Sequence, residues 1–366
     1  MSSAENTARP VRDEDAFDVD ALTAWLAERG EGPVTEVQQF RGGASNLTYL
    51  VRTVSTSSTN GGDLILRRPP SGKKAAGAHD MGREHGIQAA LQPVFPYVAT
   101  MIGHEPDESV LGSEFYVMEK VPGLILRQDL PEPLAPEEAD ALCGRVLDVL
   151  VALHSVDVAS VPALAALGKG EGYVGRQVRG WIRRLDGSRT DDTGDWSDVL
   201  AWIEEHQPAD VGQVLIHNDY RLDNLVLDED LQVRAVLDWE LATVGDPLMD
   251  LSSMIAYWVE ADDDDLFQLF RRQPSNAPGM WTRREWVDRY CARTGHAPSE
   301  RDLVFYEVFG LFRLAVIAQQ IWYRYVNKQT TNESYALLGQ VVSYLEQRCR
   351  RLVTEAGGAT ASGSGA

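Results

Sequence analysis

The stretch VLIHNDYRLDNLVL, at residues 214–227, decides the fold of this chain. Short runs of β-forming residues flank a polar loop in which Asp219 and Asn224 stand five positions apart. This is the spacing of a kinase catalytic loop, where the aspartate accepts the proton of the attacking hydroxyl group and the asparagine binds metal. Both residue types are also common in turns, so the pair alone is weak support.

A second β-rich run follows at residues 233–237 and ends at Asp238. A hairpin made of the two runs would bring Asp238 beside the first loop. Mg²⁺ prefers oxygen ligands and retains waters, so one carboxylate, one amide oxygen and nucleotide phosphate oxygens are enough to hold it. Together with His217, the residues Asp219, Asn224 and Asp238 predict phosphoryl transfer from ATP with Mg²⁺.

The predicted secondary structure changes near residue 120. Upstream the pattern predicts a helix at residues 21–29 and then strands, interrupted by one further helix; downstream it becomes helical, beginning at residues 136–154. The expected fold is therefore α+β, with a small antiparallel sheet lobe and a larger, mainly helical lobe. The predicted strands of the small lobe are residues 34–40, 47–54, 64–68, 101–103 and 115–118, and the further helix is residues 81–91.

Four segments result from this pattern. Residues 1–20 are expected to be a flexible tail, residues 21–120 the nucleotide-binding lobe, and residues 121–355 the helical lobe with the catalytic loop and the acceptor site. Residues 356–366 consist entirely of Gly, Ala, Ser and Thr, which predicts a disordered tail.

Composition narrows the partners. The formal net charge of −21 argues against nucleic acid or an anionic membrane surface, because binding there needs clustered Lys and Arg; a cationic substrate is the sharper alternative. Charged residues interrupt the apolar tract at residues 303–326, which predicts a buried helix rather than a membrane span. The N-terminus does not resemble a signal peptide. Three widely separated cysteines indicate neither disulfides nor zinc, so a cytoplasmic protein with a small-molecule substrate is expected.

A resemblance can now be named. Residues 217–227, the LDWE stretch at 237–240 and the GDPLMDL stretch at 245–251 resemble the aminoglycoside phosphotransferase and choline kinase superfamily. The chain is more narrowly similar, over about residues 34–345, to the aminoglycoside phosphotransferase-like domain that some animal proteins join to an acyl-CoA dehydrogenase. This resemblance implies a protein kinase-like fold with ATP and Mg²⁺ as cofactors.

The same resemblance implies residue roles in the helical lobe. Asp219 would be the catalytic base, Asn224 and Asp238 would bind Mg²⁺, and His217 would brace the loop. Asp250 would accept backbone N–H groups of the catalytic loop.

In the small lobe, Ser45 of the RGGASN stretch (residues 41–46) is a candidate for contact with the phosphates. Arg67 stands where the family usually has a phosphate-binding lysine, and Glu84 matches its partner. Strand alternation places Arg67 and Arg68 on opposite faces, so only one can point into the cleft. The resemblance favours Arg67 for that role, and it places adenine against backbone groups of Glu119 and Val121.

Three other signals compete. The GEGYVG stretch at residues 170–175 matches the consensus sequence of a dinucleotide-binding fingerprint, but no predicted strand precedes it. The four consecutive acids at 262–265 suit a solvated turn or, less well, a polyamine-like substrate. Most tryptophans of the large domain are expected in its core, although some could line a pocket for an acyl substrate. They are Trp181, Trp202, Trp239, Trp258, Trp281, Trp286 and Trp322.

The favoured function is a kinase that phosphorylates a metabolic hydroxyl compound, with a hydroxylated acyl substrate or its coenzyme A thioester as one candidate. Two alternatives stay open. One is an aminoglycoside O-phosphotransferase. The other is a nucleotide-binding regulatory module that has lost turnover, suggested by Arg67 in place of lysine.

Overall fold

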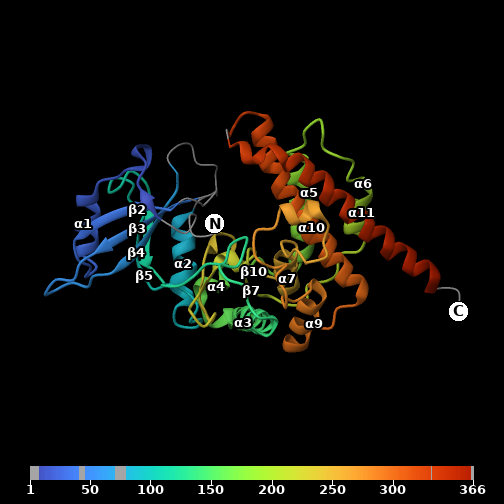
Figure 1. Cartoon of the computed structure of the whole chain (residues 1–366), viewed down its shortest axis with the longest axis horizontal. Coiled ribbons are helices and arrows are strands. Elements are labelled where there is room, and N and C mark those ends of the chain that lie inside the picture. The colour runs from blue at the N-terminus through green and yellow to red at the C-terminus, as the bar shows by residue number, and fades with distance from the viewer. Residues whose placement is uncertain (1–7, 41–45, 71–79, 331, 364–366) are drawn as a thin grey trace.

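The computed structural model describes residues 8–40, 46–70, 80–330 and 332–363, with side chains as far as Gly357. Figure 1 shows a small sheet-containing lobe beside a larger helical lobe, with helix α2 lying between the sheet and the helices. The α+β class and the two-lobed, protein kinase-like arrangement predicted from the sequence are confirmed.

The small lobe is built on an antiparallel sheet. Residues along each strand alternate between its two faces, so each face buries its own cluster of apolar side chains. Tyr49, Val51 and Leu66 pack under α1 (Val19–Ala27) on one face. Leu50 and Ile65 lie on the other face with α2 (Met81–Leu91). The sheet has the order β1-β2-β3-β4-β6-β5, formed by β1 (Arg9–Pro10), β2 (Val34–Gln39), β3 (Leu47–Thr53), β4 (Asp63–Arg68), β5 (Met101–Glu105) and β6 (Phe115–Glu119).

The first part of the chain departs from the expected tail. Strand β1 pairs with β2, a 3-10 turn covers Asp13–Asp15, and α1 begins at Val19 with the Asp18 carboxylate as its N-cap. The reason is long-range: Arg68 donates 2.7 Å to the carbonyl oxygen of Asp15, and Gln39 donates 2.8 Å to its carboxylate. A polar segment that is held by hydrogen bonds to distant residues needs no periodic pattern of apolar residues. Its order is therefore not visible in the local sequence.

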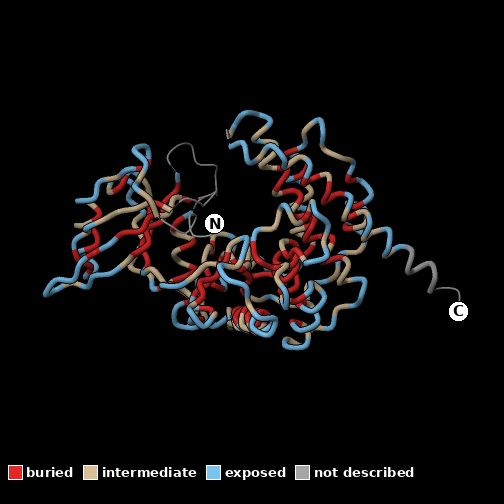
Figure 2. Tube along the Cα trace, in the orientation of Figure 1, coloured by how far each residue is buried: buried red, intermediate tan, exposed pale blue. Residues whose placement is uncertain are grey.

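Two short antiparallel strand pairs and a set of helices make up the large lobe. Strand β7 (Val214–Ile216) pairs with β10 (Thr243–Gly245), and the hairpin of β8 (Leu225–Leu227) and β9 (Val233–Val236) lies between them in the chain, so the catalytic loop connects one strand pair to the other. Figure 2 shows the buried core running through this lobe. The helices are α3 (Pro136–His154), α4 (Pro162–Ala165), α5 (Tyr173–Asp186), α6 (Ser197–Glu205), α7 (Pro247–Ile255), α8 (Asp265–Leu269), α9 (Arg283–Thr294), α10 (Glu300–Val326) and α11 (Leu338–Gly363).

Helix α10 packs against α5, α7 and α11. It is the single helix in the described part of the chain that is long and apolar enough to cross a membrane, and 67% of its most apolar window is buried inside the protein. That burial agrees with the core helix predicted for residues 303–326. Most of the tryptophans named above also belong to the core, with Trp239, Trp258, Trp281 and Trp286 buried.

The last helix also differs from the prediction. Helix α11 continues to Gly363, whereas a disordered tail was expected from residue 356. Extending an existing helix adds one backbone hydrogen bond per residue without the cost of a new nucleus, so weak helix formers can follow a packed segment.

Candidate active site

The catalytic loop is anchored from beneath by Asp250, in the first turn of α7. Its carboxylate accepts the backbone N–H of His217 at 2.8 Å and that of Asn218 at 2.6 Å, and His154 of α3 approaches it at 3.0 Å. Burial by itself would raise the pKa of the Asp250 carboxyl group, but the hydrogen bond and charge of His154 and the contacts with His217 hold it below its usual value. These are the backbone hydrogen bonds that the resemblance implied for Asp250.

His217 links the catalytic loop to the hairpin that carries Asp238. Its Nδ1 atom accepts the N–H of Asp219 at 3.2 Å, so Nε2 carries the proton donated to the carbonyl oxygen of Leu237 at 2.9 Å. The ring is fully buried and stands edge-on to Trp239. The side chain therefore fixes the distance between the two loops, which is a bracing function rather than a chemical one.

The Asp219 carboxylate is oriented by two neighbours in its own loop. Asn224 Nδ2 donates to Asp219 Oδ2 at 2.9 Å, and Arg221 Nε lies 3.1 Å from Oδ1. Arg221 in turn lies over the ring of Tyr257, with its guanidinium carbon 4.4 Å from the ring centre. Arg221 is not among the residues predicted from the sequence, although a cation two positions after Asp219 was the signal that could have found it.

Asn224 and Asp238 are suited to hold a magnesium ion together. The Leu237 N–H donates 2.8 Å to the Asn224 carbonyl oxygen, which ties the two loops one residue before Asp238. Because Asn224 uses its side-chain nitrogen on Asp219, its amide oxygen is left as a hard ligand. Asp238 has a φ of 65°, a left-handed conformation that Asp tolerates better than most residues and that is common at functional sites.

Arg67, and not Arg68, points toward the large lobe. It donates to Glu84 Oε1 at 2.6 Å and to Asp238 Oδ1 at 3.1 Å. Arg68 turns to the opposite face, where it donates to Tyr49 and to the carbonyl oxygen of Leu111. Burial raises the pKa of the Glu84 carboxyl group, and the charge of Arg67 opposes that rise. Arg67 therefore keeps the pairing with Glu84 expected of the usual lysine.

The remaining predicted nucleotide contacts lie at the edge of the sheet and the segment after it. Glu119 ends β6, and Val121 packs against the apolar cluster of Leu50, Ile65 and Met118. Among the described residues, the backbone N–H of Val121 has no hydrogen-bond partner. An apolar surface beside a backbone donor is suitable for a purine ring. Ser45 lies outside the described residues.

The structure also explains why the GEGYVG stretch does not bind a dinucleotide. It runs into the first turn of α5, which begins at Tyr173, and the Asp210 carboxylate accepts the N–H groups of Gly172, Tyr173 and Val174 at 2.7–2.9 Å. A pyrophosphate would need those same donors at the helix N-terminus. The position that the fingerprint requires for an anion is thus filled by the protein itself.

The acidic run at 262–265 is largely structural. Asp263 pairs with Arg283 at 2.6 Å and with Arg348 at 2.8 Å. Asp264 caps α8 and accepts the hydroxyl group of Tyr344. Two of its four carboxylates therefore already have partners within the protein, which leaves few carboxylates to bind a polyamine.

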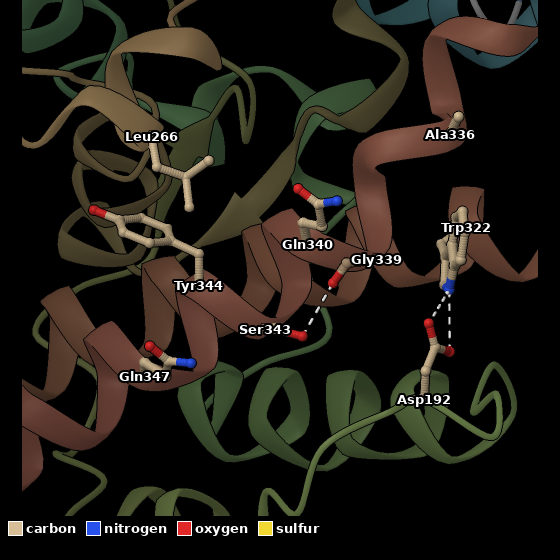
Figure 3. Close-up of a pocket in the computed structure, with 9 residues that line it drawn as sticks. All are labelled: Asp192, Leu266, Trp322, Ala336, Gly339, Gln340, Ser343, Tyr344 and Gln347. Carbon is tan, nitrogen blue, oxygen red and sulfur yellow. Dashed lines mark hydrogen bonds between the residues drawn. The ribbon is translucent and has the colours of Figure 1, made fainter.

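A hollow of about 440 Å³ lies away from the catalytic loop, between α10 and α11. Figure 3 shows Trp322 donating to Asp192 on one side and Tyr344 with Leu266 on the other. Trp322, one of the tryptophans considered for an acyl pocket, lines this hollow, but none of the predicted catalytic, nucleotide-contact or metal-binding residues does, so the hollow does not belong to the candidate active site.

Comparison with known proteins agrees with this geometry. Residues 36–287 match the model of a family described as "Phosphotransferase enzyme family". A solved structure from Ralstonia eutropha JMP134, provisionally assigned to the aminoglycoside phosphotransferases, is 30% identical with a TM-score of 0.76, covering 93% of this chain and 99% of that one. Choline kinase from Cryptosporidium parvum, at 12% identity, has a TM-score of 0.60 over 93% of this chain and 97% of its own, which supports the fold alone.

The curated relatives are longer proteins. Mouse acyl-CoA dehydrogenase family member 10 is 32% identical over 355 residues, which is 95% of this chain and 32% of that protein. Mouse family member 11 is covered to 42%. The chain therefore spans about a third to two fifths of the length of these relatives.

Proposed function

This chain belongs to the phosphotransferase enzyme family that its residues 36–287 match, and from that premise we propose that it transfers the γ-phosphate of ATP to a hydroxyl group of a small metabolic molecule. One observation carries the proposal. Asn224 donates to Asp219, the Leu237 N–H next to Asp238 donates to the Asn224 carbonyl oxygen, and Arg67 reaches Asp238 from the other lobe.

Each residue has a distinct task in this proposal. Asp219, aligned by Arg221 and Asn224, accepts a hydrogen bond from the acceptor hydroxyl group and orients it for in-line attack. Asn224 and Asp238 would hold Mg²⁺, which supplies charge neutralisation to the phosphate oxygens when bound. Arg67 contributes positive charge at the phosphates while Glu84 keeps its side chain extended.

The adenine would lie against the apolar cluster of the sheet, with backbone groups of Glu119 and Val121 as its hydrogen-bond partners. ATP fits this arrangement because the ring needs a flat apolar surface and a few backbone contacts. The phosphates then extend toward Arg67 and Asp238, on the side of the sheet that faces the large lobe.

For the acceptor, we propose a metabolic hydroxyl compound, with a hydroxyacyl substrate as the leading candidate. The names of the matched relatives contain acyl-CoA dehydrogenase, and the chain corresponds to only part of each. An aminoglycoside is the alternative suggested by the family's solved structures. The idea of an inactive regulatory module is disfavoured because Arg67 retains both ion pairs, to Glu84 and to Asp238.

The proposal is tested by titrating the purified chain with Mg·ATP in a calorimeter and by following ADP release with hydroxyacyl and aminoglycoside panels. We expect Asp238→Ala to abolish magnesium-dependent binding. Asp219→Asn should retain binding and lower turnover by about 10²–10⁴-fold, since it removes the group that receives the proton.

Asp230→Ala is the matched control, because it removes an exposed carboxylate from the turn of the same β8–β9 hairpin. It should behave like the unaltered chain. Absence of nucleotide binding at any magnesium concentration would rule out the kinase function. Equal binding by the Asp238→Ala and Asp230→Ala variants would rule out the assigned metal site.

A further inference from the structure

A basic hollow of about 310 Å³ lies along one side of α5. Arg176, Arg179 and Arg183 follow one another at helical spacing, so they stand on one face of the helix. We call this site the α5 hollow. The residues with cationic side chains that line it are Lys169, Arg176, Arg179, Arg183 and Arg184.

The cations of the α5 hollow lie together without an acidic partner. In the described part of the chain, none of the five forms an ion pair with a carboxylate. By contrast, Arg283 pairs with Glu260 and Asp263, and Arg284 pairs with Asp288 and Glu300. Within the α5 hollow, Arg176 donates to the backbone carbonyl oxygens of Gly170 and Glu171 and not to a carboxylate.

The hollow is connected to the catalytic loop. Tyr173, which lines it, has its hydroxyl group 3.3 Å from Asn218 Oδ1, immediately before Asp219. Arg313 donates 2.8 Å to the Asn218 carbonyl oxygen and lies over one side of the Trp181 ring system, to which Arg184 is also close. A molecule held in the hollow can therefore present another of its groups to the catalytic loop.

Crowding of like charges is visible in the same place. Partial burial lowers the pKa of Arg184, and the charges of Arg313 and Arg183 lower it further. Guanidinium groups gathered without a counter-ion repel one another, and an anion that enters relieves this repulsion.

We infer that the α5 hollow binds a phosphate or pyrophosphate group of the acceptor substrate, so that the substrate is anionic and carries this group away from the hydroxyl that is phosphorylated. The inference rests on the proposed function and specifies its acceptor. Several guanidinium groups on successive helical turns suit the oxygens of phosphate groups, which they contact in a bidentate manner. A ligand with a single carboxylate would need only one of these guanidinium groups.

The same charge argues against an aminoglycoside at this site. A polycation would meet five like charges with no carboxylate among the residues that line the hollow. A hydroxyacyl group joined to a phosphate-bearing carrier has the required chemistry, with the hydroxyl at one end and the anionic groups at the other.

The test is a calorimetric titration with inorganic pyrophosphate, carried out in EDTA so that no metal-dependent nucleotide site competes. We expect binding to one site, weaker at higher ionic strength, and weaker by about tenfold in Arg179→Gln/Arg183→Gln, which removes two exposed charges but keeps good helix formers. The control is Arg301→Gln/Arg351→Gln, which removes the same charge from exposed positions on other helices.

A second measurement uses turnover. With a hydroxyacyl coenzyme A thioester, the Arg179→Gln/Arg183→Gln variant should raise KM with little change in kcat, whereas the free hydroxy acid should show no difference between variants. Failure of pyrophosphate to bind, or equal binding by both double variants, would overturn the inference. Mg·ATP titrations of the same proteins separate this result from failure of the kinase function, which would show as lost nucleotide binding.

Discussion

At Arg67, a single guanidinium group satisfies carboxylates from both lobes. It pairs with Glu84 of α2 and with Asp238 of the large lobe, and Glu84 is only 1% exposed. Lysine would offer one ammonium point charge to two carboxylates on opposite sides of the cleft. The planar fork of arginine can serve both at once, which accounts for the substitution without loss of the usual arrangement.

We therefore expect Arg67→Met to lower the free energy of unfolding by about 3–5 kcal/mol, because it leaves Glu84 buried without its partner. The double variant Arg67→Met/Glu84→Gln should recover most of that loss. Urea denaturation at neutral pH measures both. If the single and double variants were equally stable, the pair would not be the buried interaction described.

At the scale of elements, α2 positions several functional side chains although its apolar pattern is weak. The Asp80 carboxylate caps it, and Met81, Glu84, Ile87 and Leu91 form its buried stripe. The next residue after Glu84 is His85, whose ring stacks on His104 of β5 at 5.5 Å and lies 6.2 Å from Tyr116 of β6. Glu114 contacts the far nitrogen of His104 at 2.9 Å.

The position of His85 makes the docking of α2 sensitive to pH. Burial lowers the pKa of His85 below 6.5, and the neighbouring His104 lowers it further. The His85 side chain therefore binds a proton more readily in the unfolded chain than in the folded one. Its contribution to stability is present above pH 6.5, and it is lost as the pH falls from the His85 pKa of the unfolded chain toward the lower His85 pKa of the folded chain.

We expect the melting temperature to fall between about pH 7.5 and pH 5.5, and to fall less in His85→Gln, which cannot be protonated. Differential scanning fluorimetry at matched ionic strength measures the two slopes. Parallel curves for the two proteins would show that His85 does not contribute to this pH dependence.

On the scale of the whole molecule, the two lobes are joined by side chains as well as by the connecting chain. Arg83 of α2 donates 2.8 Å to the carbonyl oxygen of Glu240 and also donates to that of Ala242, both in the large lobe. Figure 1 shows α2 between the sheet and the large lobe, where such contacts can set how the two lobes sit against each other. Relative motion of lobes is the usual behaviour when an interface is polar and small.

Arg83→Lys should therefore weaken Mg·ATP binding by about fivefold, because one ammonium group cannot hold two carbonyl oxygens in place of the fork. Calorimetry provides the measurement. Arg145→Lys, on α3, is the control for the same chemical change away from the lobe junction and should bind as the unaltered chain does. Equal affinities for all three proteins would exclude the junction as a determinant of nucleotide binding.

The sequence by itself determined the architecture and the catalytic motif. The bounds predicted for the helices at residues 81–91 and 136–154 coincide with α2 and α3. The local sequence specifies such elements through the spacing of its apolar residues and through its turn and capping residues. The spacing of Asp219, Asn224 and Asp238 is likewise a local property of the β8–β9 hairpin and of the residues on either side of it.

The tertiary structure alone decided features that depend on distant partners. Arg67 was separated from Arg68 by Glu84 and Asp238, and β1 was placed by contacts from other strands. The α5 hollow also depends on the fold, because folding brings its cations together without a carboxylate among the residues that line it. Charge pairing and burial are set by three-dimensional proximity, because Coulomb energy and desolvation depend on distance and environment rather than on order in the sequence.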